Sequence, residues 1–558
     1  MRFESITIKN FRNFDEVTVT LSNKNVFFGL NDVGKTNFLY ALRFVFDKDV
    51  RRLNFVDSDY HNKRTGIPIE ILITLDISDS DAADSQKLRA QLKGALRSGQ
   101  NKVYIKLVAE YSTGELSGIP LLFWGGDLDK LCEMKQRGNL YDIDYVFNVF
   151  YIDSYVDLQM LFRKNAAALV KNEGEEDQGV LQAIQDTIQA LNAHIASLSG
   201  IRDFESRITP EYKKFKNEDV SISVKSEVGV KNFYANVVPY IHRDGDDNLY
   251  PTAGEGRKKL LAYSIYDLLS IESAEKKINL FLVEEPETHL HKSMQIALSR
   301  ILFSDEKYGY LFVSTHSPFV LYEMDSVNLV RVFNATKITG ASTFYKVPEG
   351  FETMRKMLNR RLAEAIFADR VLLVEGESEC LLFEKVLSVV SPFFEADGIY
   401  ILGVCGVGFD KYYNILRRLH ISALIKTDND LRSVSTGGYS VLGFSRVNGL
   451  IDKKLLPTER IAAGDVAAKR ALYDANKSTL DSIRFDSGVY LSRCDLENDL
   501  FEVLGESLRD YLWADDAVTY LQEAKQCHMV ELIEGISDDD CRKIYNHYNF
   551  ACLKAVNG

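Results

Sequence analysis

The stretch Gly29-Leu30-Asn31-Asp32-Val33-Gly34-Lys35-Thr36 decides the fold of this chain, because it matches the spacing G-x-x-x-x-G-K-[ST] in full. Apolar residues 25–28 predict a strand before it, and residues 37–46 predict a helix after it. In this setting backbone N–H groups face phosphates, the lysine reaches the β- and γ-phosphates, and the threonine binds Mg²⁺. A simple glycine-rich turn would not explain the lysine and threonine. The residues predicted to bind ATP or GTP are Asn31, Asp32, Gly34, Lys35, Thr36 and Asn37.

The composition is that of an ordinary globular protein with room for two to four domains. The chain has 558 residues, of which 46% are hydrophobic and 26% charged. No apolar run is long enough to span a bilayer, and Met1–Glu4 lacks a signal-peptide layout, so we expect a cytoplasmic protein without a membrane partner. The seven cysteines form no CxxC pair, which argues against a zinc ribbon or a disulfide framework. A net charge of −13 argues against a non-specific coat on nucleic acid, but leaves room for a local basic groove.

Two further strand ends supply polar groups that nucleotide hydrolysis needs. The apolar run Ile278–Val283 ends in Glu284 and Glu285, and the apolar run Tyr310–Val313 is followed by His316. Beside a phosphate-binding loop, the first carboxylate is expected to hold Mg²⁺ through water and the second to polarise the attacking water as the catalytic base. Glu284 stands where an aspartate is usual. His316 is predicted to contact the γ-phosphate.

A segment of small residues, Leu249–Lys259, opens an apolar helix over residues 260–269, which is typical of an anion site. The order of phosphate-binding loop, small-residue helix start, acidic strand end and strand-end histidine resembles the ABC-type ATPases of the SMC and RecF kind. The resemblance implies an ATP-sandwich dimer, in which this segment of one subunit caps the ATP held by the other. The segment departs from the usual S-G-G-Q, and the residues that would carry the role are Thr252, Gly254 and Gly256.

An insertion between the two parts of the ATPase carries a helical apolar pattern. Its members alternate between spacings of three and four residues and are Leu181, Ile184, Ile188, Leu191, Ile195 and Leu198. The pattern is typical of a coiled-coil seam, although an amphipathic helix packed on its own domain has the same signature over so short a length. The position of the segment between the ATPase parts favours a dimerisation arm.

Carboxylates gather at strand ends in the second half of the chain. Strand-like residues 371–374 end in Glu375, and strand-like residues 421–427 end in Asp428. Such positions form sites at the carboxyl edge of a parallel sheet. Oxygen ligands without histidine or cysteine suit Mg²⁺ or Mn²⁺ rather than zinc, whereas the alternative interpretation is helix caps and surface acids. The candidate metal ligands here are Glu375, Glu379, Asp428, Asp430, Asp495 and Glu497.

A strand ending in Glu-Gly followed by a strand ending in Asp-x-Asp resembles the Toprim domain of topoisomerases, primases and some nucleases. An ABC-type ATPase followed by a Toprim domain in one chain resembles the OLD (overcoming lysogenization defect) family of ATP-dependent nucleases. The strings that carry this resemblance are GLNDVGKTN at Gly29, FLVEEPETHLH at Phe281, VSTHSP at Val313, VLLVEGESE at Val371, TDND at Thr427 and CDLENDL at Cys494.

The resemblance implies an α/β chain with a divided N-terminal SMC/RecF-like ATPase and a C-terminal Toprim domain. The expected parts are an ATPase over residues 1–155 and 221–345, a helical dimerisation insert over 156–220 and a Toprim domain over 346–558. By the same resemblance, two divalent ions, Mg²⁺ or Mn²⁺, are held by Glu375, Glu379, Asp428, Asp430 and Glu497, with Asp495 near them. Glu375 and Asp428 are then catalytic. A C-terminal lysine is also expected to steady the transition-state charge, and the candidates are Lys543, His547 and Lys554.

The function implied by the resemblance is a metal-dependent DNA endonuclease or nickase that is regulated by an ATPase dimer or higher oligomer. Defence against phage, with a co-encoded helicase or reverse transcriptase as partner, is a further expectation from the same source. The main alternative is a non-cleaving ATPase clamp on DNA or in a protein complex. A primase would need a zinc ribbon, and a type II topoisomerase a tyrosine-bearing breakage domain. An RNA nuclease stays open, because Toprim chemistry does not by itself distinguish the two nucleic acids.

Overall fold

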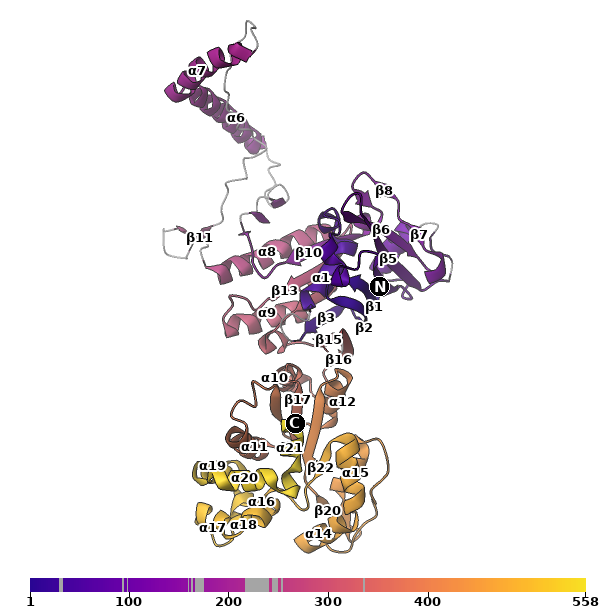
Figure 1. Cartoon of the computed structure of the whole chain (residues 1–558), viewed down its shortest axis with the longest axis vertical. Coiled ribbons are helices and arrows are strands. Elements are labelled where there is room, and N and C mark those ends of the chain that lie inside the picture. The colour runs from indigo at the N-terminus through magenta and orange to yellow at the C-terminus, as the bar shows by residue number, and fades with distance from the viewer. Residues whose placement is uncertain are drawn as a thin grey trace. The chain divides into compact units, whose positions relative to one another are not determined.

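The computed structural model describes residues 1–29, 34–92, 95–97, 99–158, 160–161, 164–165, 175–215, 240–242, 249–251, 254–334 and 337–558 (Figure 1). These residues form two compact units. The first contains residues 1–149, 280–287 and 291–558, and the second contains residues 150–279 and 288–290. Among the residues predicted to bind ATP, Asn31, Asp32 and Thr252 lie outside the described residues. No helix within the described ranges is long and apolar enough to cross a membrane.

The first unit begins with an antiparallel sheet in the order β2-β1-β4-β5-β6-β7. Alternating apolar residues decide its inner face, so that Ile6 and Ile8 of β1 are buried against Ile71 and Ile73 of β4. The strands are β1 (Arg2–Phe11), β2 (Phe14–Thr20), β4 (Ile69–Asp76), β5 (Lys102–Ser112), β6 (Ser117–Gly125) and β7 (Cys132–Glu133). Short elements around the sheet are α2 (Lys48–Arg51), α3 (Ala83–Gln91), α4 (Ile143–Val146), β8 (Gln136–Arg137) and β9 (Leu140–Tyr141). The strand β10 (Phe147–Ile152) is an edge strand of the second sheet.

A second sheet in the same unit contains the strands of the nucleotide elements. Parallel pairing joins β13 to β14, β14 to β3 and β3 to β15, and β16 closes the edge in antiparallel fashion. Since carboxyl ends of parallel strands share one edge, the segments after β3, β13 and β14 are brought together there. The elements are β3 (Lys24–Phe28), α1 (Lys35–Phe46), β13 (Ile278–Glu284), α9 (Lys292–Ser304), β14 (Leu311–Ser314), β15 (Val327–Asn334) and β16 (Ile338–Tyr345).

The C-terminal part of the first unit is built on a four-stranded parallel sheet in the order β18-β17-β19-β22. Its strands are β17 (Arg370–Val374), β18 (Ile399–Gly403), β19 (Ser422–Thr427) and β22 (Val489–Leu491), and a small hairpin is formed by β20 (Leu431–Ser433) and β21 (Tyr439–Val441). The strands predicted to end in Glu375 and Asp428 are therefore confirmed, and they are direct neighbours in register.

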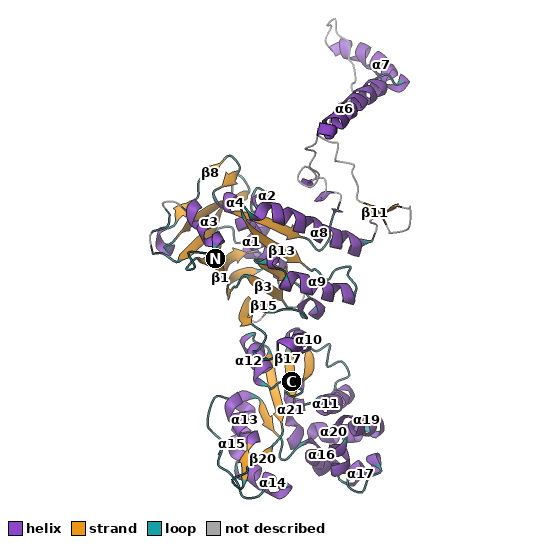
Figure 2. Cartoon of the chain, turned by 180° about the vertical axis from the view of Figure 1, so that it is seen from behind, coloured by secondary structure: helices purple, strands orange, loops and turns teal. Residues whose placement is uncertain are grey.

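Helices enclose this parallel sheet from both sides. Figure 2 shows α11, α16, α19 and α20 on one side of β17, and α13, α14 and α15 on the other. One continuous apolar core joins Leu372 and Val374 of the sheet to buried residues of the first group. The helices are α10 (Arg355–Ile366), α11 (Glu377–Val390), α12 (Asp410–Arg418), α13 (Leu442–Leu450), α14 (Val466–Ala475), α15 (Lys477–Ser487), α16 (Leu496–Leu504), α17 (Glu506–Leu512), α18 (Ala517–Glu523), α19 (Lys525–Gly535), α20 (Asp538–Asn546) and α21 (Ala551–Asn557).

Arg331 of β15 joins the second sheet to the C-terminal part. Its guanidinium donates to the carbonyl of His420 at 2.7 Å and to a carboxylate oxygen of Asp369 at 2.7 Å. The side chain of Arg331 is largely buried. Nearby, the hydroxyl of Tyr345 donates at 2.6 Å to Asn359 of α10. These hydrogen bonds hold the segment that leads into β17 in place.

The second unit carries the insertion and the helix that follows it. Its elements are α6 (Glu175–Ala196), α7 (Ser199–Phe215), β11 (Tyr240–His242), β12 (Leu249–Pro251) and α8 (Glu255–Ala274). The helix predicted from the apolar seam is confirmed over most of its length, but α6 ends before Leu198, so the last member of the seam falls outside it. Leu191 is 47% exposed, so the described residues leave about half of this apolar side chain uncovered.

We predict that Arg51→Ala lowers the free energy of unfolding by about 3–5 kcal/mol, because it leaves a buried carboxylate without its cation. Arg51 and Asp144 pair at 2.5 Å with side chains only 4% and 5% exposed. The neighbouring Arg52 pairs with Asp49 at 3.9 Å on the surface, so Arg52→Ala should change stability by less than about 1 kcal/mol. Urea unfolding of both variants checks this, and equal losses would contradict it.

Candidate functional site

The end of β3 and the start of α1 form the phosphate-binding element. Gly34 caps α1 with a φ of 100°, and a Cβ atom there would overlap the side chain of Asn13, so any residue other than glycine is excluded. Lys35 is buried, and its ammonium donates to the carbonyl of Gly29 at 3.1 Å. The lysine is thus held at the mouth of the loop, where the sequence predicts the β- and γ-phosphates.

The two predicted Mg²⁺ ligands of the ATPase meet directly. The hydroxyl of Thr36 donates to a carboxylate oxygen of Glu284 at 2.7 Å, although 248 residues separate them in the chain. Hydroxyl and carboxylate oxygens are ligands that Mg²⁺ accepts, so this pair fits the ion. The side chain of Asn37 accepts from Arg12 at 3.0 Å and donates to Asn13 at 2.7 Å, both of which lie between β1 and β2.

Glu285 and His316 lie side by side at the edge of this sheet. The Nε2 atom of His316 is 3.6 Å from a carboxylate oxygen of Glu285, whose φ of 40° is left-handed. Burial lowers the pKa of His316, and Lys35 lowers it further, so the imidazole is neutral near pH 7. A neutral imidazole beside a carboxylate can orient a water or a phosphate by hydrogen bonding without adding charge.

Glu287 is a residue of this edge that the sequence prediction missed. Its carboxylate accepts from the backbone N–H of His316 at 2.6 Å and from the hydroxyl of Thr315 at 2.9 Å. Burial raises its pKa. The side chain therefore positions the histidine segment, and the signal for it was the third glutamate of Glu-Glu-Pro-Glu.

The small-residue segment of the second unit is described from Gly254 onward. Gly254 caps α8, and Gly256 lies in its first turn. A Cβ atom on Gly256 would come within 2.8 Å of the carbonyl oxygen of His289, so this position has no space for a side chain. The close approach explains the glycine by packing.

The second group of predicted residues meets at the ends of β17 and β19. A carboxylate oxygen of Glu375 accepts from the backbone N–H of Asp428 at 2.9 Å and from the hydroxyl of Thr427 at 2.6 Å. Arg446 of α13 pairs with the same carboxylate and with Asp430, the latter at 2.7 Å. Arg446 was not predicted, and no sequence motif marks it.

Three carboxylates of this site are withdrawn from solvent. Glu379 and Asp428 are each 8% exposed, and Glu497 is 1% exposed. Burial raises the pKa of Glu379, and burial with the charge of Glu375 holds the pKa of Asp428 well above its usual range. Within the part of the chain that the structure describes, the Oε2 atom of Glu497 is buried without a hydrogen-bond partner. Carboxylates that are buried in this way need nearby cations to offset their negative charge.

Lys525, the first residue of α19, supplies one of these cations. Its ammonium lies 3.4 Å from a carboxylate oxygen of Glu497. Burial lowers the pKa of Lys525, but Glu497, Asp428 and Glu379 outweigh burial and leave the pKa above its usual value. The lysine therefore stays charged and faces three predicted metal ligands.

The lysine candidates proposed from the sequence lie elsewhere. Lys543 pairs with Asp540 at 2.7 Å, and the ammonium of Lys554 lies over the ring of Tyr545. His547 accepts from the backbone N–H of Asn549 and so caps a short helical turn. Lys525, whose ammonium lies beside Glu497, therefore joins these three residues as a candidate for the expected role. Lys525 precedes all three in the chain, and no surrounding motif distinguishes it.

Asp495 has a structural explanation as well as the predicted one. Its carboxylate accepts from the backbone N–H of Asn498 at 2.9 Å and so caps α16. It also lies 3.5 Å from the ammonium of Lys469. Its charge nevertheless acts on Asp428, which keeps it at the border of the site.

The donor set of the strand-end site fits a hard divalent ion in kind, since it consists of carboxylates, one of them with an unpaired buried oxygen. The arrangement is nevertheless not closed around an ion: across the described residues, no three acidic, histidine or cysteine side chains stand close enough to enclose a metal. Arg446 pairs with Asp430, and Lys525 pairs with Glu497, at the border of this donor set.

Comparison with known proteins finds a known domain in each half of the chain. The model for the TOPRIM domain of overcoming lysogenization defect-like proteins matches residues 366–430, and the model for an AAA ATPase domain matches residues 1–136 and 154–321. The chain is accordingly an α/β enzyme that joins an ATPase domain to a TOPRIM nuclease domain, and it uses a nucleotide and divalent metal.

The chain belongs to the OLD-like family of endonucleases that includes GajA. It is 44% identical to Endonuclease GajA of Bacillus cereus strain VD045, over 100% of this chain and 99% of that protein. It is 21% identical to the Old nuclease of Escherichia phage P2, over 98% of each chain. The solved C-terminal region of the Burkholderia pseudomallei OLD protein is 17% identical, with 34% of this chain and 100% of that chain covered, at a TM-score of 0.25.

We predict that Glu285→Gln lowers steady-state ATP hydrolysis by about 100-fold or more, because an amide cannot polarise the attacking water. ATP binding should persist, since Lys35 and Thr36 are untouched. Phosphate release and equilibrium binding of a fluorescent ATP analogue measure the two properties. Glu306→Gln, at an exposed glutamate, is the control that should keep normal turnover. Normal hydrolysis by Glu285→Gln would contradict the assignment.

Proposed function

We propose that this chain is an ATP-regulated, divalent-metal-dependent endonuclease that nicks DNA. The observation that carries the proposal is the junction of β17 and β19, where Glu375 accepts hydrogen bonds from Thr427 and Asp428 beside buried Glu379 and Glu497. The names of the similar proteins, an endonuclease and a nuclease, favour cutting over a non-cleaving clamp. DNA is the proposed substrate on the family resemblance, and divalent ions held by the carboxylates would receive its phosphodiester.

The residues of the site at the ends of β17 and β19 would have the following roles in cleavage. Glu375, Glu379, Asp428, Asp430 and Glu497 would hold Mg²⁺ or Mn²⁺, with Asp495 near them. Bound divalent ions supply an activated water and stabilise the leaving 3′-oxygen. Lys525 would neutralise charge that develops on the phosphate, since its ammonium is already directed at the carboxylates.

The ATPase would control this cutting through a dimer. Lys35, Thr36, Asn37 and Gly34, with Asn31 and Asp32, would bind ATP-Mg²⁺, and the segment with Thr252, Gly254 and Gly256 would cap the ATP of a second subunit. The exposed apolar residues of α6 support a dimerisation arm within the insert, which we place at residues 156–220 between ATPase parts 1–155 and 221–345, with the Toprim domain at 346–558.

The biological setting is proposed on the same family resemblance. We infer an intracellular role in defence against phage, with a co-encoded partner such as a helicase or reverse transcriptase. Cutting that requires the genomic neighbour would support the partner, and full activity of the single protein would remove the need for one.

We predict that the purified protein nicks supercoiled plasmid with Mg²⁺ or Mn²⁺, and that Glu375→Ala abolishes the nicking, because the carboxylate is shared by the metal site and the β19 strand end. Lys35→Ala should change the ATP dependence of cutting without removing metal dependence. Gel analysis of the relaxed product measures both. Metal-independent binding of DNA without any nicking, alone or with the neighbouring gene product, would favour the clamp instead.

We predict that Lys525→Ala lowers the nicking rate by about 100-fold, because one charge directed at the reacting phosphate is lost. Lys543→Ala serves as the matched variant and should nick normally, since its ammonium pairs with Asp540. ATP hydrolysis by both variants reports that the ATPase domain is folded. Loss of nicking in Lys543→Ala with normal nicking in Lys525→Ala would return the role to the later lysine.

A further inference from the structure

A cavity of about 480 Å³ opens beside Glu375, on the side of β18. Its lining combines charged side chains with apolar ones and one amide: Glu375, Asp410 and Arg446, then Val404, Phe409 and Leu450, and Asn414. The volume lies in the range of small-molecule pockets, about 300–1,000 Å³, and the mixture of apolar walls with a few polar groups is also typical of them.

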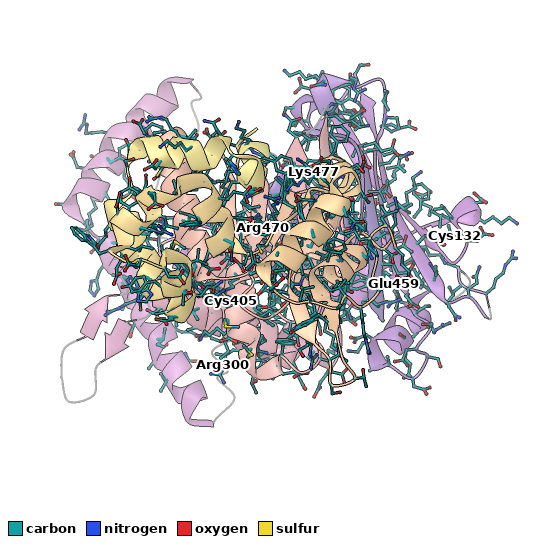
Figure 3. All side chains as sticks on the ribbon, turned by 90° about the horizontal axis from the view of Figure 1, so that it is seen from below. Cys132, Arg300, Cys405, Glu459, Arg470 and Lys477 are labelled. Carbon is teal, nitrogen blue, oxygen red and sulfur yellow. The ribbon has the colours of Figure 1, made fainter. Side chains whose placement is uncertain are left out.

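The cavity is fixed relative to the metal carboxylates by backbone hydrogen bonds. The N–H of Val404 donates to the carbonyl of Val374 at 2.9 Å, and the N–H of Cys405 donates to the carbonyl of Glu375 at 2.9 Å. Cys405, labelled in Figure 3, has a left-handed φ of 45°, and Gly406 follows with 80°. The loop after β18 therefore turns back toward the end of β17, so the cavity and Glu375 cannot move apart independently.

The opposite wall is α13, which carries Arg446, Gly449 and Leu450 on one side. A Cβ atom on Gly449 would meet no atom within 4 Å, and the same holds for Gly406. The absence of side chains at these two positions leaves the space open. Arg446 is half-buried beside Glu375 and Asp430, and it gives the cavity a cation at the point where it joins the metal site.

A phosphodiester at Glu375 brings its own sugar and base with it. Arg446 suits the phosphate, the apolar walls suit the face of a base, and the amide of Asn414 can both donate to and accept from a base edge. The side chain of Asn414 is exposed on α12 and makes no hydrogen bond to another described residue, so its amide can contact a base. Two of the lining residues, Glu375 and Arg446, also belong to the metal site, so the cavity adjoins the place where the phosphodiester is cut.

We propose that this cavity receives the nucleobase next to the scissile phosphodiester, and that Asn414 reads its edge. The inference rests on the proposed DNA nicking and adds to it a determinant of where the enzyme cuts. A base that enters the cavity leaves the helical stack, which costs less at mismatched or single-stranded positions. Nicking should therefore be faster where the flanking base pair is weak.

Gly449→Phe tests the inference by filling the cavity. The substitution replaces a helical glycine, meets open space at Cβ and leaves every carboxylate in place. We expect plasmid nicking to fall about tenfold or more, as for loss of a stacked base, with an unchanged melting temperature and ATP hydrolysis. Ser388→Phe adds the same ring to an exposed position of α11 and should nick like the wild type.

A second measurement reports the base itself. The nick positions of the wild type are first mapped by sequencing. A duplex is then made with 2-aminopurine at the base next to the mapped nick, and it is bound to the protein in Ca²⁺ in place of Mg²⁺. Binding should raise its fluorescence with the wild type but not with Gly449→Phe. Asn414→Asp, which keeps an acceptor and removes the donor, should change the base preferred at that position.

The outcomes separate this inference from the proposed function. Nicking by Gly449→Phe at the wild-type rate, together with a fluorescence rise equal to that of the wild type, would overturn the cavity while DNA nicking stands. An unchanged base preference in Asn414→Asp would overturn the reading role of Asn414. Absence of nicking by the wild type would overturn the proposed function, and this inference with it.

Discussion

Parallel pairing of strands is the constraint on which both sites depend. In a parallel sheet every strand releases its chain at the same edge, so residues that follow different strands meet there without being near in sequence. Pairing of β3 with β14, and of β14 with β13, brings Thr36 to Glu284 across most of the ATPase. Pairing of β17 with β19 brings Glu375 to Asp428 in the same way. Each site follows from strand order once the strands have formed.

The strand-end carboxylates concentrate negative charge in a buried place, which is unfavourable unless cations offset it. The structure shows how the protein limits this cost. Lys426 pairs with Asp499 at 3.2 Å beneath the site, where both side chains are almost fully buried. Arg446 and Lys525 neutralise the carboxylates above it. A metal ion at these carboxylates would compete with these side chains for Glu375 and Glu497.

The sequence predicted the features that are encoded locally. An apolar strand followed at once by a functional residue is visible in one short window, which is why the elements around Lys35, Glu284 and Glu375 were recognised and their strands confirmed. Arg446 and Lys525 could not be found in this way. They lie on helices that reach the site only through tertiary packing, and a single basic residue at a helix start has no signature of its own. The seam that ended at Leu198 was overextended, because apolar spacing does not reveal where a helix stops.

The anchoring by Arg331 bears on how the two halves of this protein can be studied. A fragment starting near residue 346 would lack β15 and β16, and with them the donors to Asp369 and to the carbonyl of His420. Asn359 would also lose its partner Tyr345. Such a fragment would then expose, at the start of β17, apolar and polar groups that are covered in the full chain. Expression of the nuclease half in isolation therefore calls for a boundary upstream of Val327, with both edge strands retained as part of its scaffold.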